Sequence, residues 1–232
     1  MKLAIIPARG GSKRIARKNI RAFAGKPIIA HSIEAALASA CFDRIVVSTD
    51  DDEIADIARS SGAEVPFKRP PELSDDHTGT SAVIRHAIEQ LDGGSGAVAF
   101  ACCIYATAPF VRAEDIRQGL LMLQSRACEF VFSVTDFAYP IERALHLGPQ
   151  GEVSMLRPQA YQTRSQDLEP AFHDAGQFYW GRAQAWIDER PVFGDGALGL
   201  RLPRHRVQDI DTPEDWIRAE WMFRAMRAAE GG

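Results

Sequence analysis

The chain has 232 residues, of which 46% are hydrophobic and 25% are charged, and its formal net charge is −4 at neutral pH. This length suits one α/β domain over residues 1–232, and the composition is that of a folded protein rather than a disordered one. The weakly negative overall charge gives no sign of a nucleic-acid partner.

The cysteines and the apolar runs indicate the cellular compartment of the protein. Cys41, Cys102, Cys103 and Cys128 form no CxxC pair and are typical of small buried hydrophobes in a reducing environment. The apolar stretch at the N-terminus ends at Pro7, too early for a signal peptide, and the longest apolar run is too short to span a bilayer. We therefore expect a cytoplasmic protein without a membrane partner.

Short apolar runs rich in Ile and Val alternate with segments of helical periodicity. The predicted strands are 3–7, 44–48, 97–104 and 129–134. The predicted helices are 28–40, 52–60, 80–91 and 114–126. This order predicts a doubly wound, mostly parallel α/β sheet of the Rossmann-like kind, in which ligands bind beyond the carboxyl ends of the strands.

Residues 135–175 interrupt this alternation of strands and helices. They are rich in Pro, Gln, Arg and His and have no clean period, which is typical of a functional excursion or an interface arm. A strand-like run follows at 176–180. A last helix is predicted from Pro213 to about residue 229, with Thr212 as its N-cap.

A basic, glycine-rich loop follows the first predicted strand. Residues 8–19, called the basic loop below, have the sequence ARGGSKRIARKN, and the first 33 residues contain no Asp or Glu. Gly10 and Gly11 could offer backbone N–H groups to an anion, and the cations could neutralise phosphate oxygens. The loop is neither a Walker A loop nor a GxGxxG fingerprint, and composition alone leaves a solvated basic loop equally open.

Several motifs in the same order resemble the acylneuraminate cytidylyltransferase family, over nearly the whole chain. They are IPARGGSKR at 6–14, RKN at 17–19, VSTDD at 47–51, RPPELSDD at 69–76 and VQDIDT at 207–212. The resemblance implies a nucleotidyltransferase fold with a dimerisation arm at 135–175 and a homodimer. It also implies CTP and an acidic nine-carbon sugar as substrates and Mg²⁺ as cofactor.

The resemblance implies a nucleotide site around the basic loop. The residues expected to bind CTP are Ala8, Arg9, Gly10, Gly11, Ser12, Lys18, Asn19, Arg69, Thr80 and Ser81. The alternatives are a surface arginine at Arg69 and a helix N-cap at Thr80 or Ser81. Arg9, Lys18 and Asp211 are expected to be catalytic, the two cations through electrostatic stabilisation.

Asp209 and Asp211 match the magnesium ligands of the family. In an extended segment, residues two apart project to the same side, so both carboxylates can reach one hard cation. The alternative is a pair of turn residues before the last helix. The second acidic cluster, at residues 50–53, is better explained by a helix start, where carboxylates offset the helix dipole.

The acceptor sugar is indicated by the segment after the third predicted strand. Tyr105-Ala106 stands where the sialic acid enzymes of the family carry Gln-Pro, and the runs 102–110 and 174–179 resemble the branch that uses pseudaminic acid. The expected sugar-binding residues are Tyr105, Thr107, Arg164, Gln177 and Tyr179. For Arg164, an exposed loop charge is the alternative, and His31 and His86 are expected to be structural.

The reaction implied is attack of the anomeric hydroxyl on the α-phosphorus of CTP, with release of pyrophosphate. Acceptors left open are sialic, legionaminic and 3-deoxy-octulosonic acids. A nucleotide-sugar-dependent glycosyltransferase, which also has an acidic pair in an α/β fold, is the alternative from another class. A non-catalytic nucleotide sensor is less favoured, because both an acidic pair and a phosphate loop are present.

Overall fold

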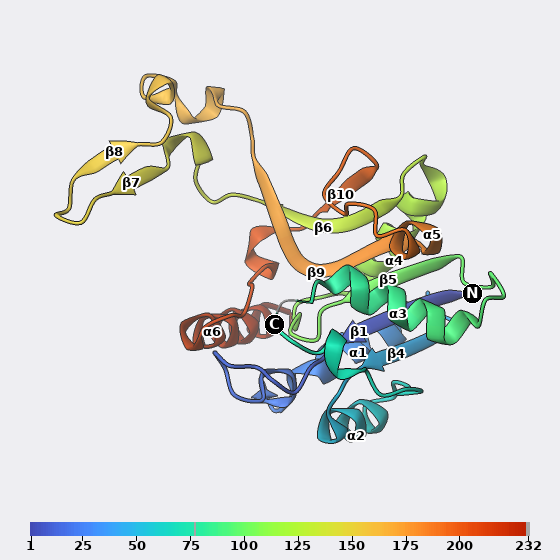
Figure 1. The fold of residues 1–232 in the computed structure, drawn as a ribbon. Helices are drawn as coiled ribbons and strands as arrows, with labels where there is room; N and C mark the ends of the chain where they lie inside the picture. The colour runs from blue at the N-terminus through green and yellow to red at the C-terminus, as the bar shows by residue number, and fades with distance from the viewer. Residues whose placement is uncertain (77, 231–232) are drawn as a thin grey trace.

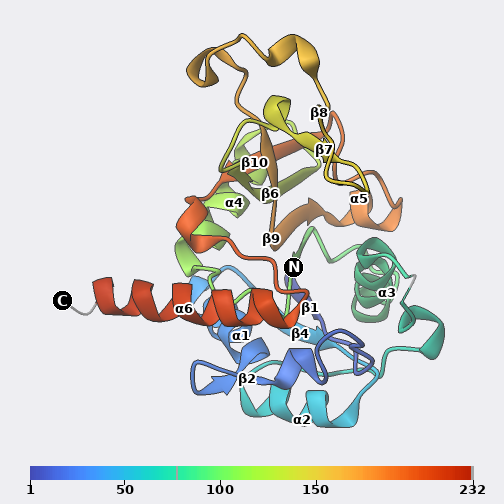
Figure 2. The ribbon, with the colours of Figure 1, turned by 90° about the vertical axis from the view of Figure 1, so that its left-hand side faces the viewer.

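The computed structural model describes residues 1–76 and 78–230. Its centre is a six-stranded sheet in the order β10-β6-β9-β5-β1-β4, with helices on both faces (Figure 1, Figure 2). Only β9 runs antiparallel to its neighbours within this sheet. The predicted doubly wound, mostly parallel sheet is therefore confirmed. The strands are β1 (Lys2–Pro7), β4 (Arg44–Ser48), β5 (Phe100–Ile104), β6 (Phe130–Asp136), β9 (Phe172–Arg182) and β10 (Ala197–Arg201).

The side chains of β1 alternate between two buried layers. Ala4 and Ile6 belong to the cluster that includes α1, α2 and α4, whereas Leu3 and Ile5 belong to the cluster that includes α3 and α5. This burial on both faces explains why the strand sequences are continuously apolar. The helices are α1 (Ile28–Ser39), α2 (Asp52–Ser60), α3 (Thr80–Asp92), α4 (Ala113–Ser125), α5 (Ala183–Ile187) and α6 (Pro213–Glu230).

The structure differs from the sequence prediction mainly in the second half of the chain. β9 is much longer than the predicted run 176–180, and neither α5 nor β10 was predicted. α5 has only five residues, which are too few to show a helical period. β10 contains Gly199, a residue that is unusual inside a strand, and a side chain at this position would meet Val134. β5 begins at Phe100 instead of residue 97.

Residues 135–175, called the arm below, leave the sheet between β6 and β9. The arm carries a small hairpin of β7 (Leu145–Leu147) and β8 (Val153–Met155), which projects away from the body (Figure 1). Its apolar side chains Leu145, Leu147, Val153 and Leu156 are exposed.

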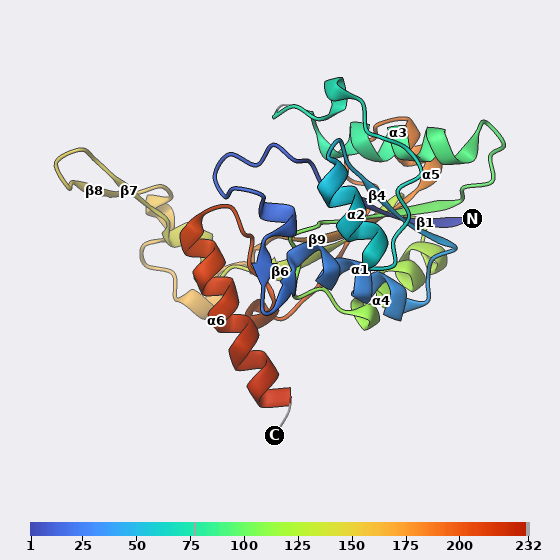
Figure 3. The same ribbon diagram turned by 90° about the horizontal axis from the view of Figure 1, so that it is seen from below.

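The C-terminal segment folds back onto the basic loop. Ile15 from that loop packs with Ile210 and Trp216 in a third apolar cluster, next to the small ribbon of β2 (Ala22–Phe23) and β3 (Lys26–Pro27). Figure 3 shows α6 beside this ribbon. The predicted helix start is confirmed, because Thr212 and Asp215 cap each other reciprocally. No described helix has the length and apolarity to cross a membrane.

Candidate active site

The basic loop lies at the carboxyl ends of β1 and β4. Ala8 is buried and donates its N–H to Ser48 O at 2.9 Å, and Asn19 donates to Arg9 O at 2.9 Å. We expected the N–H of Gly10 to be available to an anion, but it donates to Asp50 at 3.0 Å. Glycine is required there for another reason, since a Cβ at residue 10 would lie 2.6 Å from Asp51. Gly11 and Ser12 remain at the tip of the loop.

Two carboxylates outside the loop neutralise its cations. Asp76 pairs with Arg9 at 2.5 Å and also contacts Lys13. Asp211 pairs with Arg14 at 2.9 Å and with Lys18 at 3.3 Å. Lys13 and then Arg9 lower the pKa of Asp76 to about 2. The positions that phosphate oxygens would take beside these cations are therefore held by the protein's own carboxylates.

The acidic cluster at residues 50–53 starts a helix, as expected. Asp51 is the N-cap of α2 and accepts a hydrogen bond from the N–H of Ile54. It also receives two hydrogen bonds from Arg17, at 2.5 and 2.8 Å, which lower the pKa of Asp51 to about 2. Glu53 completes the arginine's contacts. The cluster anchors the basic loop to α2.

Arg69 is buried, with only 4% of its surface exposed, so the surface-arginine alternative is wrong. Its Nη2 donates to Ser48 O, whereas its buried Nε has no hydrogen-bond partner among the described residues. Burial lowers the pKa of Arg69 to about 10. A buried donor without a partner is costly, and a ligand acceptor would satisfy it.

Two adjoining cavities lie beside these residues. The first, called the Arg69 pocket, has a volume of about 220 Å³, and Arg9, Asn19 and Arg69 line it together with Thr80 and Tyr105. The second, called the Tyr179 pocket, has a volume of about 300 Å³. Thr80 and Tyr105 also line this second cavity, so they form the wall between the two. Thr80 is the first residue of α3, whose N-cap is Gly79, so the N-cap alternative fails.

The Tyr179 pocket contains some of the predicted sugar-binding residues and some that were not predicted. Tyr105 and Tyr179, which were predicted to bind the sugar, line it together with Ser81, which was predicted to bind the nucleotide. The rest of the lining was not predicted and comes from α5 and the loop after it: Trp186, Glu189, Arg190, Pro191, Val192 and Phe193. No sequence pattern marks these residues, because α5 is short and the loop after it contains no motif.

Other predicted sugar-binding residues lie elsewhere. Gln177 is 2% exposed, donates to Arg206 O at 2.5 Å and lines neither pocket. Its buried Oε1 has no hydrogen-bond partner among the described residues. Thr107 is half-buried in the turn after β5 and also lines neither. Arg164 lies on the arm, 74% exposed at its side chain, and pairs with Asp167 at 2.9 Å. Within one chain it is not brought to the site.

Asp209 and Asp211 flank Ile210, which is fully buried. Because neighbours in an extended segment point to opposite sides, both carboxylates project away from the core beside the basic loop. Partial desolvation and then the charge of Asp211 raise the pKa of Asp209. Residues 1–76 and 78–230 contain no group of three or more His, Cys, Asp or Glu side chains arranged to hold a metal. Two carboxylates fit a hard cation that takes its other ligands from phosphate and water.

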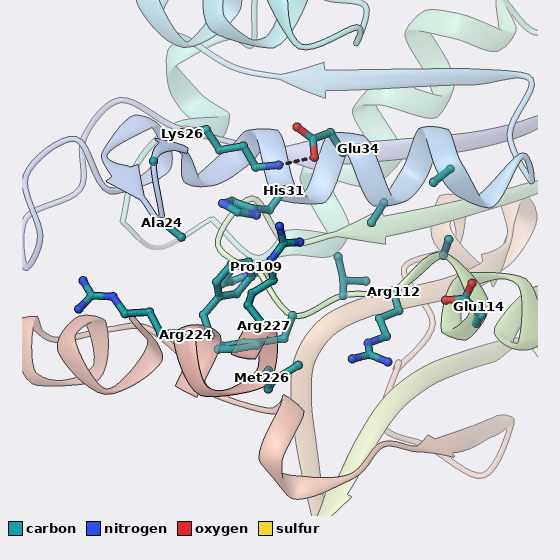
Figure 4. A pocket seen from close by; sticks show the side chains of 17 residues that line it. Ala24, Lys26, His31, Glu34, Pro109, Arg112, Glu114, Arg224, Met226 and Arg227 are labelled. Atoms are coloured by element: carbon teal, nitrogen blue, oxygen red, sulfur yellow. Dashed lines mark hydrogen bonds and ion pairs between the residues drawn. The ribbon is translucent and has the colours of Figure 1, made fainter. Parts of the chain in front are cut away.

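A hollow of about 870 Å³ lies apart from these residues, between α1 and α6 (Figure 4). Lys26 and Glu34 form an ion pair on its wall. His31, predicted to be structural, lies there with its Nε2 3.0 Å from Phe23 O, and burial lowers its pKa. The hollow contains none of the predicted nucleotide, sugar or metal residues.

Comparison with known proteins identifies similar chains. The family model described as cytidylyltransferase matches residues 3–175. Pseudaminic acid cytidylyltransferase of Campylobacter jejuni is 45% identical over 96% of each chain. CMP-N,N'-diacetyllegionaminic acid synthase of Legionella pneumophila is 36% identical over 94% of each. The structure of CMP:2-keto-3-deoxy-manno-octonic acid synthetase in complex with CTP shares the fold, with a TM-score of 0.69 and 17% identity over 99% of each chain.

The pairing of Asp76 with Arg9 and Lys13 predicts that this carboxylate competes with bound phosphate. Asp76→Asn should tighten the binding of inorganic tripolyphosphate, roughly two- to fivefold, as measured by titration calorimetry. Because the pKa of Asp76 is about 2, the difference should persist at neutral and mildly acidic pH. Asp56→Asn, which removes an exposed acid on α2, is the control. Unchanged or weaker binding in a folded Asp76→Asn protein would contradict the competition.

Proposed function

This chain belongs to the cytidylyltransferase family, and we propose that it transfers CMP from CTP to the anomeric hydroxyl of pseudaminic acid, with release of pyrophosphate. The observation that carries the proposal is the pair of adjoining pockets, because a nucleotide and an acceptor must meet across a short distance. The Arg69 pocket has the basic loop and an unsatisfied buried arginine donor. The Tyr179 pocket has aromatic and hydroxyl groups suited to a sugar.

In this proposal, the basic loop and the Arg69 pocket bind CTP. Arg9 and Lys18 exchange their carboxylate partners for phosphate oxygens and neutralise charge as the bond to pyrophosphate breaks. Arg69 Nε donates to the nucleotide. Asn19 keeps the loop in place through Arg9 O, and Thr80 and Ser81 face the boundary with the acceptor.

Cytidylyltransferases of this family typically work with a divalent metal ion, and we propose Mg²⁺ held by Asp209 and Asp211. When bound, such an ion neutralises charge on the phosphate oxygens and orients them. Lys18 supports the pair from the protein side, since its Nζ donates to Ile210 O at 2.7 Å and contacts Asp211.

The acceptor is proposed from the relatives and from the pocket wall. The chain is more similar to the Campylobacter pseudaminic acid enzyme than to the Legionella legionaminic acid enzyme. Tyr105 forms the wall at the position where the sialic branch carries an amide. A glycosyltransferase function, the alternative from another class, has no support from the family match.

The arm is proposed to form a homodimer and to bring Arg164 near the partner's acceptor pocket. The apolar side chains of its hairpin are exposed in one chain, which is typical of a surface that another chain covers.

The metal assignment predicts the behaviour of Asp211. Asp211→Asn should lower the rate of pyrophosphate release by about 100-fold or more, because a metal ion supplies several kcal/mol of charge stabilisation. Chelation should abolish release by the unchanged protein. Glu214→Gln, an exposed acid in the first turn of α6, is the control and should leave the rate unchanged. Full activity after complete chelation would refute the metal.

The acceptor assignment predicts a ranking of kcat/KM. With CTP and Mg²⁺, pseudaminic acid should exceed sialic and legionaminic acids by about 10⁴-fold, since buried hydrogen-bonding groups left unpaired by the wrong isomer penalise it strongly. A higher value for either competitor would overturn the assignment of the sugar. Release of CMP instead of pyrophosphate would overturn the reaction itself.

The arm proposal predicts a dimer in solution that depends on the hairpin. Leu147→Asp with Val153→Asp should give a monomer in analytical ultracentrifugation, because each change buries a charge at the interface. Leu121→Asp, at an exposed leucine of α4 outside the arm, is the control and should remain dimeric. A monomeric unchanged protein would contradict the proposal.

A further inference from the structure

Arg17, near the end of the basic loop, has a backbone conformation that its residue type does not favour. Its φ is +54° and its ψ is +33°, in the left-handed region that glycine and asparagine adopt most readily. Among the described residues, Ala24, Ala40 and Glu189 also have positive φ, but they lie in the β2–β3 turn or follow a helix, where this conformation is common. Arg17 instead precedes a turn at the candidate active site, so its conformation needs a stabilising contact from elsewhere.

The side chain of Arg17 provides that contact. Its Nη1 and Nη2 donate to the two carboxylate oxygens of Asp51 at 2.5 and 2.8 Å, and Nη2 also donates to Glu53 at 2.5 Å. A fork of this kind fixes the guanidinium in direction as well as in distance. Asp51 is itself held, because it accepts the N–H of Ile54 as the N-cap of α2 and donates its own N–H to Thr49 Oγ1. The arginine is therefore tied to the start of a packed helix.

The backbone carbonyl of Arg17 closes the turn that follows. The N–H groups of Ile20 and Arg21 both donate to Arg17 O, at 3.0 and 2.9 Å, around the short 3₁₀ helix Lys18–Ile20. The φ of Arg17 sets the direction in which the chain enters this turn. The two hydrogen bonds therefore report whether residue 17 keeps its left-handed conformation.

Lys18 and Asn19 lie in this turn, and both have defined partners. Lys18 Nζ donates to Ile210 O at 2.7 Å, beside the acidic pair proposed to hold the metal. Asn19 lines the Arg69 pocket and donates to Arg9 O at 2.9 Å. A different φ at residue 17 would redirect the chain and separate both side chains from these partners. The placement of two predicted nucleotide-binding residues thus depends on the conformation of the residue before them.

We propose that Arg17 is a positioning residue, whose pairing with Asp51 and Glu53 keeps residue 17 left-handed and thereby presents Lys18 and Asn19 to the triphosphate of CTP. The proposal rests on the proposed function, and it goes beyond it by giving a role to an arginine that lines neither pocket. Arg17 acts through its neighbours and is not itself a phosphate ligand, because its Nη atoms already donate to the carboxylates of α2.

Substitutions at residue 17 separate the conformation from the charge. Leucine lacks the guanidinium fork and disfavours the left-handed region, so Arg17→Leu should release the turn. Asparagine also lacks the fork, but it adopts the left-handed region more readily than most residues that have a side chain. Arg17→Asn should therefore keep the turn without the ion pairs. Both variants lose the same positive charge, so a difference between them reports the backbone conformation.

Amide hydrogen exchange in the free protein measures the turn directly. Exchange of the Ile20 and Arg21 N–H groups should be about 10-fold faster in Arg17→Leu, and less than about threefold faster in Arg17→Asn, than in the unchanged protein. Exchange within α3 and α4 should stay the same in both variants. Arg59→Leu, which removes an exposed arginine of α2 that pairs with Asp56, is the matched control and should leave the turn intact.

Anion binding should follow the same order. Calorimetry with inorganic tripolyphosphate should show binding about 10-fold weaker in Arg17→Leu and about threefold weaker in Arg17→Asn, the smaller loss reflecting the missing charge alone. The KM for CTP should rise in the same order. The KM for the acceptor should change by less than about twofold, since the turn contributes no residue to the Tyr179 pocket.

Asp51→Asn tests the other half of the pair, because the amide can still cap α2 while the ion pair is lost. Exchange of the Ile20 and Arg21 amides should become faster, and adding Arg17→Leu should have little further effect. Unchanged exchange in Asp51→Asn would overturn the proposal. Equal tripolyphosphate affinities in Arg17→Leu and Arg17→Asn would overturn it too, by making Arg17 a phosphate ligand. If the unchanged protein released no pyrophosphate from CTP while the exchange rates followed the expected order, the proposed function would fail and the positioning of the turn would stand.

Discussion

The concentration of positive charge in the basic loop is the constraint around which the carboxyl edge of the sheet is built. The first 33 residues supply no acid of their own, so carboxylates must come from distant segments. Asp51 comes from the start of α2, Asp76 from the segment before α3, and Asp211 from the segment before α6. Exposed ion pairs contribute little stability singly. Together they hold the basic loop against α2 and against the segments before α3 and α6.

The parts that sequence predicted well are those whose signal is local. The strands of the first half are apolar because both faces are buried, as Leu3 and Ile6 show, and the capping pair at Thr212 marks the last helix without tertiary information. The length of β9 was not predictable, because its bulge, a register shift opposite Ser133 of β6, is a feature of pairing across the sheet. The burial of Arg69 was not predictable either. An arginine that precedes two prolines has the same local sequence whether it is buried or lies on the surface.

The sequence motifs contained more of the residues that line the Arg69 pocket than of those that line the Tyr179 pocket. The nucleotide residues sit in motifs, and phosphate chemistry demands cations and carboxylates that stand out in a sequence. The Tyr179 pocket includes Trp186 of α5 and Phe193 of the loop after it, and neither residue belongs to a sequence motif. Gln177 and Tyr179 are two residues apart in the sequence, yet only Tyr179 lines the pocket. In the bulge it turns toward Arg206 instead.

Charge cannot explain which acceptor is chosen. CTP and every candidate sugar acid are anionic, so the basic loop attracts them alike and raises the rate of encounter without selecting a stereoisomer. Selection must come from neutral groups whose hydrogen bonds are directional and desolvated. The wall of Thr80 and Tyr105 has this character, and it touches both pockets. A single hydroxyl there can be matched by one isomer and left unpaired by another, provided that its donor direction is fixed.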